Sequence, residues 1–410
     1  MKKIILVTNN HLVSNPRLVK EAISLYEAGF EIQVFYCQSL NEIVQFDKLI
    51  ESNNPKIKFI PINIASLPLL HKIYYKIKIS INKVLFDVLG WSLFLNNSFT
   101  YLSNYVYNRI KNEYADLIIG HNIAMLPTVV KYSKHTRTPF AFDIEDAYSL
   151  QNTKDLYKPD KYIHQLESRN LYKASYISFA SPFYLEYYRK EYFLKNKLIT
   201  ILNTFPVMNF TVEQYFDRVD LNKISLYWYS QTVGLDRGLD DIIYALNNVE
   251  QNVFELHIRG KCDEKTKSTL LNLAQTEELR ANIYFHELVD PEDLKLRTAE
   301  HDIGLALEQD NSINRDWCLT NKIFEYFSAG ILIIASKTSA QFKLLNTHED
   351  VCFLYESKNI EELVKVLNKL IGIKTQLGSL KNNSKALAQG SYNWDNTKVI
   401  LNQTVKEFLN

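Results

Sequence analysis

Lys322 and Glu325 form an opposite-charge pair in the otherwise apolar segment LTNKIFEYFSAGILIIAS, residues 319–336. If Thr320 or Asn321 caps the helix expected here, Lys322 lies beside its positively polarised start, which suits a phosphate. Glu325 is one turn further along, too far for a capping box, and can accept two hydrogen bonds from a ribose diol. The pattern therefore indicates a nucleotide site, and the alternative is a Lys–Glu pair on a solvated helix face.

A glycine-containing loop between an expected strand and an expected helix could bind the same anion. In SQTVGLDRGLDDII, residues 230–243, Gly234 and Gly238 flank Arg237. Glycines allow close backbone approach, and an Arg guanidinium can bind a phosphate through two parallel hydrogen bonds. Turn glycines beside a solvated Arg remain the alternative.

Two further polar groups follow expected strands in the first half of the chain. LIIGHN contains His121, and FAFDIEDAYS contains Asp143, Glu145 and Asp146. In open parallel α/β domains, ligands bind beyond the carboxyl ends of the strands. Clustered carboxylates could bind sugar hydroxyls or act as a base, although a lone histidine is more often structural and solvated acids are common at strand ends. No ligand spacing typical of a metal site accompanies them, so no metal is expected.

The elements that must position these residues alternate between strand and helix. Strand patterns occupy residues 2–8, 31–37, 115–122, 139–146, 175–181, 223–230, 254–260, 281–288, 302–309, 331–336 and 351–357. Helical patterns occupy residues 14–30, 124–135, 164–174, 238–249, 266–279, 291–301, 319–329 and 391–409. Ser14 is the expected N-cap of the first helix. This alternation predicts right-handed βαβ crossovers and an α/β fold with largely parallel sheets.

Length and composition indicate a soluble globular chain of two domains. The 410 residues exceed the usual size of roughly 100–200 residues per domain, and 46% of them are hydrophobic and 23% charged. No uncharged apolar run of 18 residues or more predicts a membrane span, and the short apolar run at the N-terminus fits a buried strand better than a signal peptide. Four scattered cysteines fit a reducing cytoplasm, and a net charge of +1 gives no reason to expect a nucleic-acid partner.

Residues 66–86, SLPLLHKIYYKIKISINKVLF, depart from this pattern because they contain four lysines and no acidic residue. Leu69, Ile73, Ile77, Ile81 and Leu85 recur at every fourth position, and Lys72, Lys76 and Lys83 fall on a different side. Such a helix could lie in an anionic membrane interface. It could equally pack on the first domain with its lysines in solvent, and both interpretations stay open.

Taken together, SNPRLVKEA, RGLDDIIYAL, HIRG, DIGLAL and TNKIFEYFSAG resemble the retaining nucleotide-sugar glycosyltransferases of the GT-B fold, in their family-4-like group. The resemblance covers nearly the whole chain and is strongest in the second half. It implies two Rossmann-like domains that face a cleft: an acceptor-side domain over residues 1–205 and a donor domain over residues 206–385. A C-terminal helix over residues 386–410 would return to the first domain.

The resemblance also implies roles for individual residues. Arg237 matches the basic residue that grips the donor diphosphate, Glu325 the glutamate that holds the ribose, and His121 the histidine that contacts the transferred sugar. The implied donor-binding residues are Thr232, Gly234, Arg237, Gly260, Asn321, Lys322 and Glu325. The implied sugar or acceptor residues are Asn10, His121, Asp143 and Glu145, and the implied catalytic residues are His121, Arg237, Lys322 and Glu325. No cofactor or metal is implied beyond the nucleoside-diphosphate sugar itself.

The chain also departs from the family pattern. Where relatives show E-x7-E, the position of the first glutamate is Trp317, with Asp316 just before it and Glu308 further upstream. Other departures are Gln231 and Thr232 in place of a second basic residue, Glu145 in place of a histidine, Ile331 in place of a proline, and NNHLVSN in place of a glycine-containing loop. These departures concern the implied contacts to the sugar and to the phosphates.

The implied activity is hexosyl transfer from a nucleoside-diphosphate sugar to a hydroxyl acceptor with retention of configuration, by front-face attack. The acceptor would be a glycan or a lipid-linked glycan in surface polysaccharide or glycolipid synthesis, with the protein in the cytoplasm or peripheral on the inner face of the plasma membrane. Two alternative functions would use the same donor-binding residues. One is an epimerase that recruits His121, Asp143 and Glu145, and the other is a non-catalytic nucleotide-sugar-binding subunit.

Overall fold

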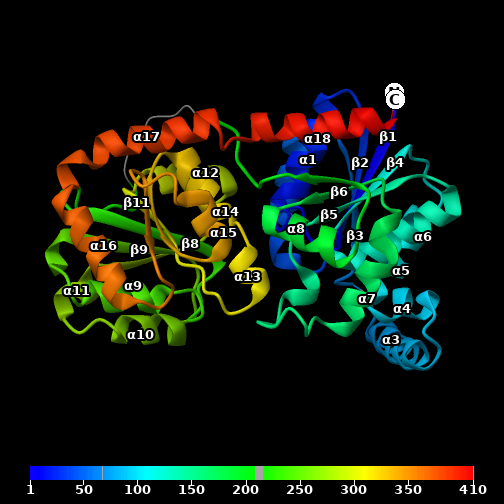
Figure 1. Cartoon of the computed structure of the whole chain (residues 1–410), viewed down its shortest axis with the longest axis horizontal. Coiled ribbons are helices and arrows are strands. Elements are labelled where there is room, and N and C mark those ends of the chain that lie inside the picture. Colours follow the sequence, from blue (N-terminus) through cyan, green and yellow to red (C-terminus); the bar gives the residue numbers. More distant parts are fainter. Residues whose placement is uncertain (67, 208–215, 410) are drawn as a thin grey trace. The chain divides into compact units, whose positions relative to one another are not determined.

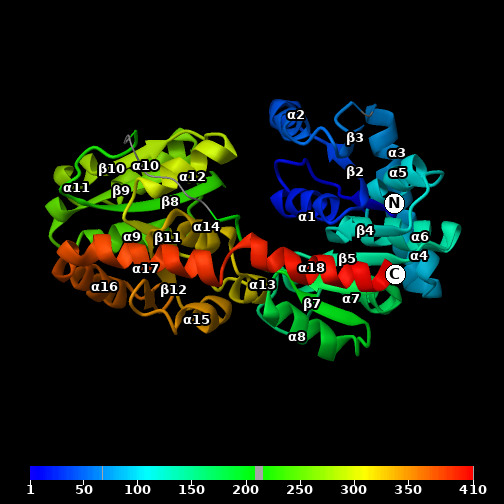
Figure 2. The same ribbon diagram turned by 90° about the horizontal axis from the view of Figure 1, so that it is seen from above.

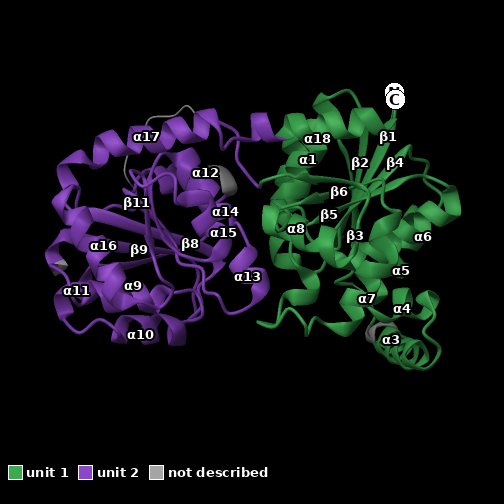
Figure 3. Cartoon of the chain, viewed as in Figure 1, with its two compact units in different colours: residues 1–202, 398–410 green, residues 203–397 purple. Residues whose placement is uncertain are grey.

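The computed structural model describes residues 1–66, 68–207 and 216–409, and divides the chain into two compact units (Figure 3). Unit 1 comprises Met1–Leu202 and Lys398–Asn410, and unit 2 comprises Asn203–Thr397. The domain boundary that we predict at residues 205/206 falls just inside unit 2. The final helix, α18 (Trp394–Leu409), begins in unit 2 and continues in unit 1.

Unit 1 is built on one parallel seven-stranded sheet with the order β3-β2-β1-β4-β5-β6-β7 (Figures 1 and 2). Its strands are β1 (Lys3–Val7), β2 (Glu31–Gln38), β3 (Lys58–Asn63), β4 (Leu117–His121), β5 (Phe140–Ile144), β6 (Tyr176–Phe179) and β7 (Lys197–Thr200). Its helices are α1 (Pro16–Glu27), α2 (Val44–Asn53), α3 (Leu69–Leu89), α4 (Ser92–Ser98), α5 (Tyr101–Ile110), α6 (Leu126–Thr136), α7 (Lys161–Asn170) and α8 (Pro182–Glu191). Because the order reverses beside β1, the carboxyl ends of β1 and β4 form a topological switch point.

Unit 2 repeats this order with six parallel strands, β10-β9-β8-β11-β12-β13 (Figure 2). Its strands are β8 (Ile224–Thr232), β9 (Phe254–Lys261), β10 (Ile283–His286), β11 (Ile303–Ala306), β12 (Leu332–Ser336) and β13 (Cys352–Tyr355). Its helices are α9 (Leu239–Leu246), α10 (Glu264–Asn272), α11 (Glu277–Ala281), α12 (Pro291–Ala299), α13 (Ile313–Trp317), α14 (Asn321–Ala329), α15 (Ser339–Leu345), α16 (Ile360–Gly372) and α17 (Leu377–Gly390). The switch point of this unit lies between β8 and β11.

The predicted α/β class and the two Rossmann-like parallel sheets are confirmed. Central strands such as Leu332–Ser336 are buried along their whole length, as expected when helices cover both faces of a parallel sheet. The sequence missed the edge strands β3 and β7, whose apolar runs are short. The predicted cap of α1 was wrong by one residue, because Asn15 rather than Ser14 accepts the backbone N–H of Leu18.

The end of the chain differs from the closing helix predicted over residues 386–410. Residues 386–390 belong to α17, which ends at Gly390, and the last helix begins at Trp394. Asn393 separates the two helices, since its side chain accepts from the backbone N–H of Asn396 and donates to the carbonyl of Ala388. An Asn that bonds to the backbone in this way ends one helix and caps the next.

The basic segment of residues 66–86 largely forms α3, which Figure 1 shows beside α4 at the periphery of unit 1. Residue 67 and the side chains of Leu69 and Lys72, which belong to the predicted pattern, lie outside what the structure describes. Within the described ranges, no helix combines the length and the apolar character that crossing a membrane requires.

One face of the unit 2 sheet carries a buried polar cluster instead of an apolar layer. His257 lies 2.9 Å from His286 between ring nitrogens, and the ring of His301 stacks on Tyr227 at a centroid distance of 4.3 Å. Asp217 accepts from Arg259 and lies 3.5 Å from His286. Burial lowers the pKa of His286 to about 4 and that of His301 to about 3, so both rings are neutral in the folded protein near pH 7.

These depressed pKa values predict that unit 2 loses stability in mild acid. A histidine in the unfolded chain has a pKa of about 6.5. Below that pH the unfolded state binds protons at His286 and His301 and the folded state does not, so the free energy of unfolding falls. The expected loss is roughly 3 kcal/mol or more between about pH 6.5 and pH 4. Denaturant unfolding of the full chain, followed at several pH values in this range, measures it.

His301→Phe should reduce the slope of this pH dependence, because the substituted ring can still stack on Tyr227 but does not titrate. The matched control is His164→Gln in unit 1, which should leave the unit 2 transition unchanged. The carboxylates of Asp217 and Glu255 have lowered pKa values and lose their contribution only at more acidic pH. A flat stability profile down to pH 4.5, or an unchanged slope in His301→Phe, would contradict the prediction.

Candidate functional site

Two loops of unit 2 meet at its switch point and are held together by tight packing. Gly238 is the N-cap of α9 with a φ of 73°, a left-handed conformation that favours glycine. A Cβ on Gly238 would overlap the backbone oxygen of Leu307 and crowd the side-chain nitrogen of Gln309. Gln309 in turn donates to Asp241 at 3.0 Å. The loop after β8 is thus fixed against the end of β11.

Five side chains at this switch point form a chain of alternating charge. Its members, in order of contact, are Arg237, Asp236, Arg315, Glu308 and Lys322. The closest contact joins Lys322 Nζ to Glu308 Oε1 at 2.7 Å, and the other three neighbouring pairs lie 3.7 to 3.8 Å apart. We call these five residues the charge chain. It contains three cations and two carboxylates, so it keeps a surplus of positive charge.

The two ends of the charge chain differ in burial. The side chains of Glu308 and Lys322 are 10% and 12% exposed, whereas those of Arg237 and Asp236 are 33% and 64% exposed. Burial raises the pKa of the Glu308 carboxyl, but Lys322, Arg315 and Arg237 outweigh burial and lower that pKa below its usual value. Glu308 is therefore ionised, and it attracts these cations from the buried end of the charge chain. The guanidinium of Arg237, at the other end, is accessible to an anionic ligand.

Helix α14 presents Lys322 as predicted, with Thr320 at its N-cap position. The carboxylate that Lys322 contacts is Glu308, not Glu325, so the alternative of a Lys322–Glu325 pair on a solvated face is wrong. Glu325 is only 2% exposed and lies on the buried side of the helix. Asn321 accepts from the side chain of Asn203. The predicted ribose contact of Glu325 therefore stays a prediction that needs local opening.

The other predicted donor residues lie on the neighbouring strand ends. Thr232, the last residue of β8, is exposed and pairs with Lys261 of β9. Gly260 has a φ of 151°, and a Cβ there would overlap the backbone oxygen of Ser230. A Cβ on Gly234 would crowd Asp236. These two glycines therefore allow the strand ends and the loop beside the charge chain to pack closely.

A second charged cluster occupies the switch point of unit 1. His121, the last residue of β4, is fully buried, and its ring nitrogens lie 3.0 Å from Glu21 and 3.1 Å from Glu145. Asp143 receives two hydrogen bonds from Arg17, at 2.6 and 2.7 Å. Burial lowers the pKa of His121, but the surrounding carboxylates outweigh it and raise that pKa well above the usual value. The imidazole is therefore a cation in the folded protein.

Of the predicted sugar-side residues in this cluster, only Glu145 reaches solvent. Its side chain is 21% exposed, whereas those of His121 and Asp143 have no exposed area. Oε1 of Glu145 accepts a hydrogen bond from Nδ2 of Asn15 at 3.0 Å and another from Nδ1 of His121 at 3.1 Å. Asn122, next to His121, has a φ of 73°, a strained conformation for a residue other than glycine. Any contact of this cluster with a ligand therefore passes through Glu145.

Asn10, also predicted on the sugar side, lies half-buried in the loop after β1 and accepts from Asn9 at 3.1 Å. His11 fixes this loop. Its Nε2 accepts from the backbone N–H groups of Ser39 and Leu40, so Nδ1 carries the proton and donates to Asp47 at 2.6 Å.

His121, Asp143 and Glu145 offer ligand atoms within 4.8 Å of one another, the spacing that a metal ion would need. Their chemistry does not fit a metal, because Arg17 and Ser178 already occupy the oxygens of Asp143 and the raised pKa of His121 keeps its nitrogens protonated. A metal ion would have to displace a buried guanidinium and a proton.

Sequence reasoning missed several members of both clusters, namely Arg17, Glu21, Asp236 and Arg315. Arg17 and Glu21 are four residues apart on α1, which begins beside the switch point, and this spacing could have revealed them. Asp236 lies in the loop after β8 and Arg315 in the five-residue helix α13, which is too short to show a periodic pattern. Glu308 stood out only as a glutamate at the wrong distance from Glu325.

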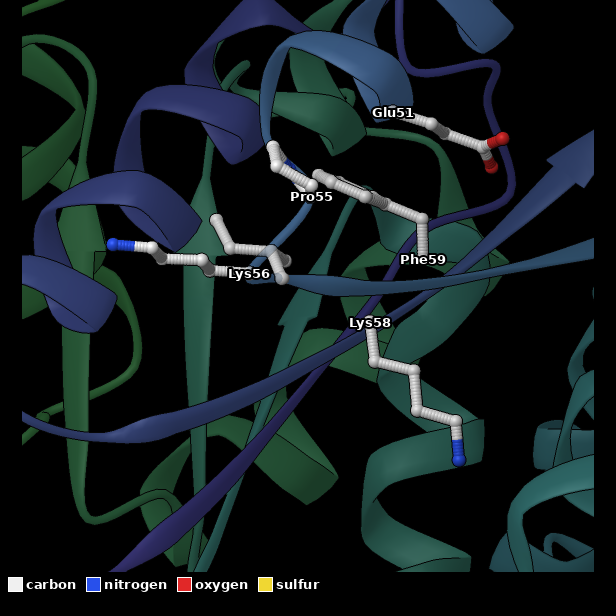
Figure 4. A pocket seen from close by; sticks show the side chains of 6 residues that line it. Glu51, Pro55, Lys56, Lys58 and Phe59 are labelled. Atoms are coloured by element: carbon white, nitrogen blue, oxygen red, sulfur yellow. The ribbon is translucent and has the colours of Figure 1, made fainter.

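A shallow hollow in unit 1 shares no residue with either cluster. It is lined by Glu51, Pro55, Lys56, Ile57, Lys58 and Phe59 (Figure 4). Figure 4 shows the ammonium groups of Lys56 and Lys58 pointing away from each other, so they do not converge on one anion. The hollow sits at the amino end of β3, opposite the edge where parallel sheets bind ligands.

Known proteins resemble this chain in part of its sequence and in its whole fold. Residues 242–397 match the family model described as "Glycosyl transferase-like". No curated protein matches the chain by sequence. Among solved structures, a glycosyltransferase from Rickettsia africae is similar over 100% of this chain and 99% of its own, at 13% identity and a TM-score of 0.70. HepE from Anabaena, solved with UDP-glucose, covers 100% of this chain and 99% of its own, at 14% identity and a TM-score of 0.67.

The chain has the GT-B fold of glycosyltransferases. Sucrose-phosphate synthase from Thermosynechococcus elongatus agrees, at 13% identity and a TM-score of 0.67 over 99% of both chains. The GT-B fold that the sequence motifs implied is therefore confirmed over the whole chain, and residues 242–397 also match a glycosyltransferase-like family model.

The packing at Gly238 predicts that Gly238→Ala destabilises unit 2. A side chain in the left-handed region costs roughly 1–2 kcal/mol, and the overlap with Leu307 adds to that cost. The matched control is Gly378→Ala in α17, where a Cβ meets no atom within 4 Å and should raise stability by up to about 1 kcal/mol. Denaturant unfolding compares the two, and equal stabilities would contradict the assigned packing.

Proposed function

We propose that this protein transfers a hexosyl group from a nucleoside-diphosphate sugar to a hydroxyl acceptor, with retention of the anomeric configuration. The observation that carries the proposal is the charge chain at the switch point of unit 2. Its surplus positive charge suits a diphosphate, and it lies at the sheet edge where such folds bind nucleotides.

Similar proteins support the nucleotide part of the proposal. HepE is solved with UDP, with UDP and glucose, and with UDP-glucose, and a TarM structure from S. aureus contains UDP and alpha-GlcNAc-glycerol. These ligands belong to those proteins. For this chain they favour a nucleoside diphosphate in unit 2 and a glycan acceptor.

In the proposed reaction, the bond between the anomeric carbon and the diphosphate oxygen breaks, and the electron pair stays on the diphosphate. Arg237 and Lys322 would stabilise that charge, the electrostatic part of catalysis. A diphosphate oxygen would help to take the proton of the acceptor hydroxyl as it attacks from the same face, which gives retention. The cationic His121 would orient Glu145 toward a hydroxyl group of the sugar or the acceptor.

The two alternatives predict different outcomes in one assay. An epimerase would change the sugar of the donor without any acceptor, and a non-catalytic subunit would bind donor without releasing nucleoside diphosphate. Burial argues against the epimerase, because two of its three candidate acid or base groups, His121 and Asp143, have no exposed area.

Arg237→Ala and Glu325→Ala should each lower the rate of nucleoside-diphosphate release by about 100-fold or more, because each removes a contact to the donor. The matched control is Arg280→Ala, which removes an Arg from α11 on the same unit. Thermal unfolding verifies that each variant is folded. Wild-type turnover in Arg237→Ala would refute the proposed site.

We also propose that the acceptor is presented at an anionic membrane, on which α3 lies. Apart from Leu89 at its last position, the exposed apolar residues described in α3 are Leu70, Ile73, Tyr74, Ile77, Ile81, Val84 and Val88, each between 45% and 79% exposed. At 3.6 residues per turn they form one stripe centred on Ile77. The opposite side, which includes Phe86 at 5% exposure, packs on unit 1.

The lysines of α3 support an anionic partner. Lys76 and Lys78 are exposed and lie on opposite flanks of the stripe, each about 100° from Ile77 around the helix axis. Such lysines can extend to lipid headgroups while the stripe enters the acyl region. Lys131 on α6 adds positive charge next to α3. Burial, and then repulsion by the nearby charges of Lys78 and Lys111, lowers the pKa of Lys131.

Vesicle sedimentation tests this partner. The full chain should bind vesicles that contain phosphatidylglycerol and not vesicles of phosphatidylcholine alone, and Ile77→Ser with Ile81→Ser should reduce binding at least tenfold. Lys76→Glu with Lys78→Glu should do the same, at about 1 kcal/mol per lysine near the surface. Tyr157→Ser, which removes a side chain that is 94% exposed elsewhere on unit 1, is the control. Equal binding to both vesicle types, or binding to neither, would refute the proposal.

A further inference from the structure

Glu308 raises a question that donor binding alone does not answer. Its carboxylate lies 2.7 Å from the Nζ of Lys322, one of the two cations proposed to stabilise the leaving diphosphate. A site that only had to hold a diphosphate would gain from a neutral residue there, because a nearby carboxylate repels the ligand. The hydroxyl of Ser336 donates to the backbone oxygen of Glu308, so the residue is held at this place.

We propose that Glu308 acts as a fixed counter-charge that favours release of the nucleoside-diphosphate product over release of the donor. This inference rests on the proposed function. When the sugar leaves, the bond to the anomeric carbon breaks and the electron pair stays on the terminal phosphate. As the new bond forms, the acceptor hydroxyl gives its proton to that phosphate, which then passes it to water. The second pKa of a terminal phosphate is about 6, so the product carries nearly one more negative charge than the donor at pH 7.

The carboxylate of Glu308 repels this extra negative charge on the product. A phosphate oxygen bound to the other side of Lys322 Nζ would lie within about 6 Å of the carboxylate. At this distance and an effective dielectric constant of about 20 to 40, Coulomb's law gives roughly a 10- to 100-fold weaker affinity per unit of extra charge. The donor is repelled as well, but less, because it lacks that charge.

The same contacts explain why the carboxylate is tolerated. Lys322, Arg315 and Arg237 outweigh its burial and keep it ionised, so it does not take up a proton to relieve the repulsion. In the ligand-free protein it neutralises part of the cationic surplus, and no buried cation of the charge chain is left without a carboxylate neighbour. Glu308 is a positioning residue by this account, since it acts through Lys322.

Glu308→Gln tests the inference, because glutamine keeps the shape and an oxygen that can accept from Lys322 but removes the charge. Calorimetric titration with UDP and UDP-glucose, and in parallel with GDP and GDP-mannose, gives the ratio of product affinity to donor affinity. Glu308→Gln should raise that ratio roughly 10-fold or more and make product inhibition correspondingly stronger. Glu308→Asp, which keeps the charge, should stay within about threefold of the wild type.

The control Glu277→Gln removes the same charge from α11, at the amino end of the sheet, and should leave the ratio unchanged. A wild type that binds nucleotide and sugar nucleotide, with the same ratio in Glu308→Gln, overturns this inference and leaves the proposed function standing. Equal loss of both affinities also overturns it, since that is the result of a misplaced Lys322. A wild type that binds none of the four ligands overturns the proposed function, and the inference with it.

Discussion

The ion pair between Lys322 and Glu308 connects the end of β11 in unit 2 to the rest of the charge chain. Glu308 lies just beyond β11, after Leu307, and a carboxylate this buried requires cations on several sides. Lys322 comes from the first turn of α14, Arg315 from α13 and Arg237 from the loop after β8. One buried anion at a strand end therefore holds three separate segments at one place and leaves their surplus charge available to a ligand.

The two switch points share a strand order and differ in the sign of their charge. In unit 1, the carboxylates of Glu21, Asp143 and Glu145 outnumber the cations Arg17 and His121. In unit 2, the cations of the charge chain outnumber the carboxylates. In a glycosyl transfer, negative charge develops on the diphosphate and positive charge on the sugar ring. The same backbone topology thus carries two electrostatic environments of opposite sign, one in each unit.

The sequence predicted the parts of this architecture that depend on period and on local chemistry. Central strands such as Leu332–Ser336 are long apolar runs with a glycine before them, and Gly238 and Arg237 identified the loop after β8. It did not predict which carboxylate Lys322 contacts, because Glu308 is 14 residues away along the chain and reaches Lys322 only through the packing of β11 against α14. The sequence also did not predict the burial of Glu325 and His121, because the type of a side chain and its place in a helix or strand do not determine how exposed it is.

The missing first glutamate of the E-x7-E pattern is better understood from the contacts around α13. Asp316 is the nearest carboxylate along the chain, but it accepts from the backbone N–H and the hydroxyl of Ser339, at 2.8 and 2.6 Å, and so caps α15. Its charge is used to stabilise a helix start. Glu308 is the carboxylate that remains beside Lys322, and it arrives from a strand end instead of the loop before α14. A family motif can therefore be absent from the sequence while the structure supplies a carboxylate from another element, which is why spacing alone could not identify it.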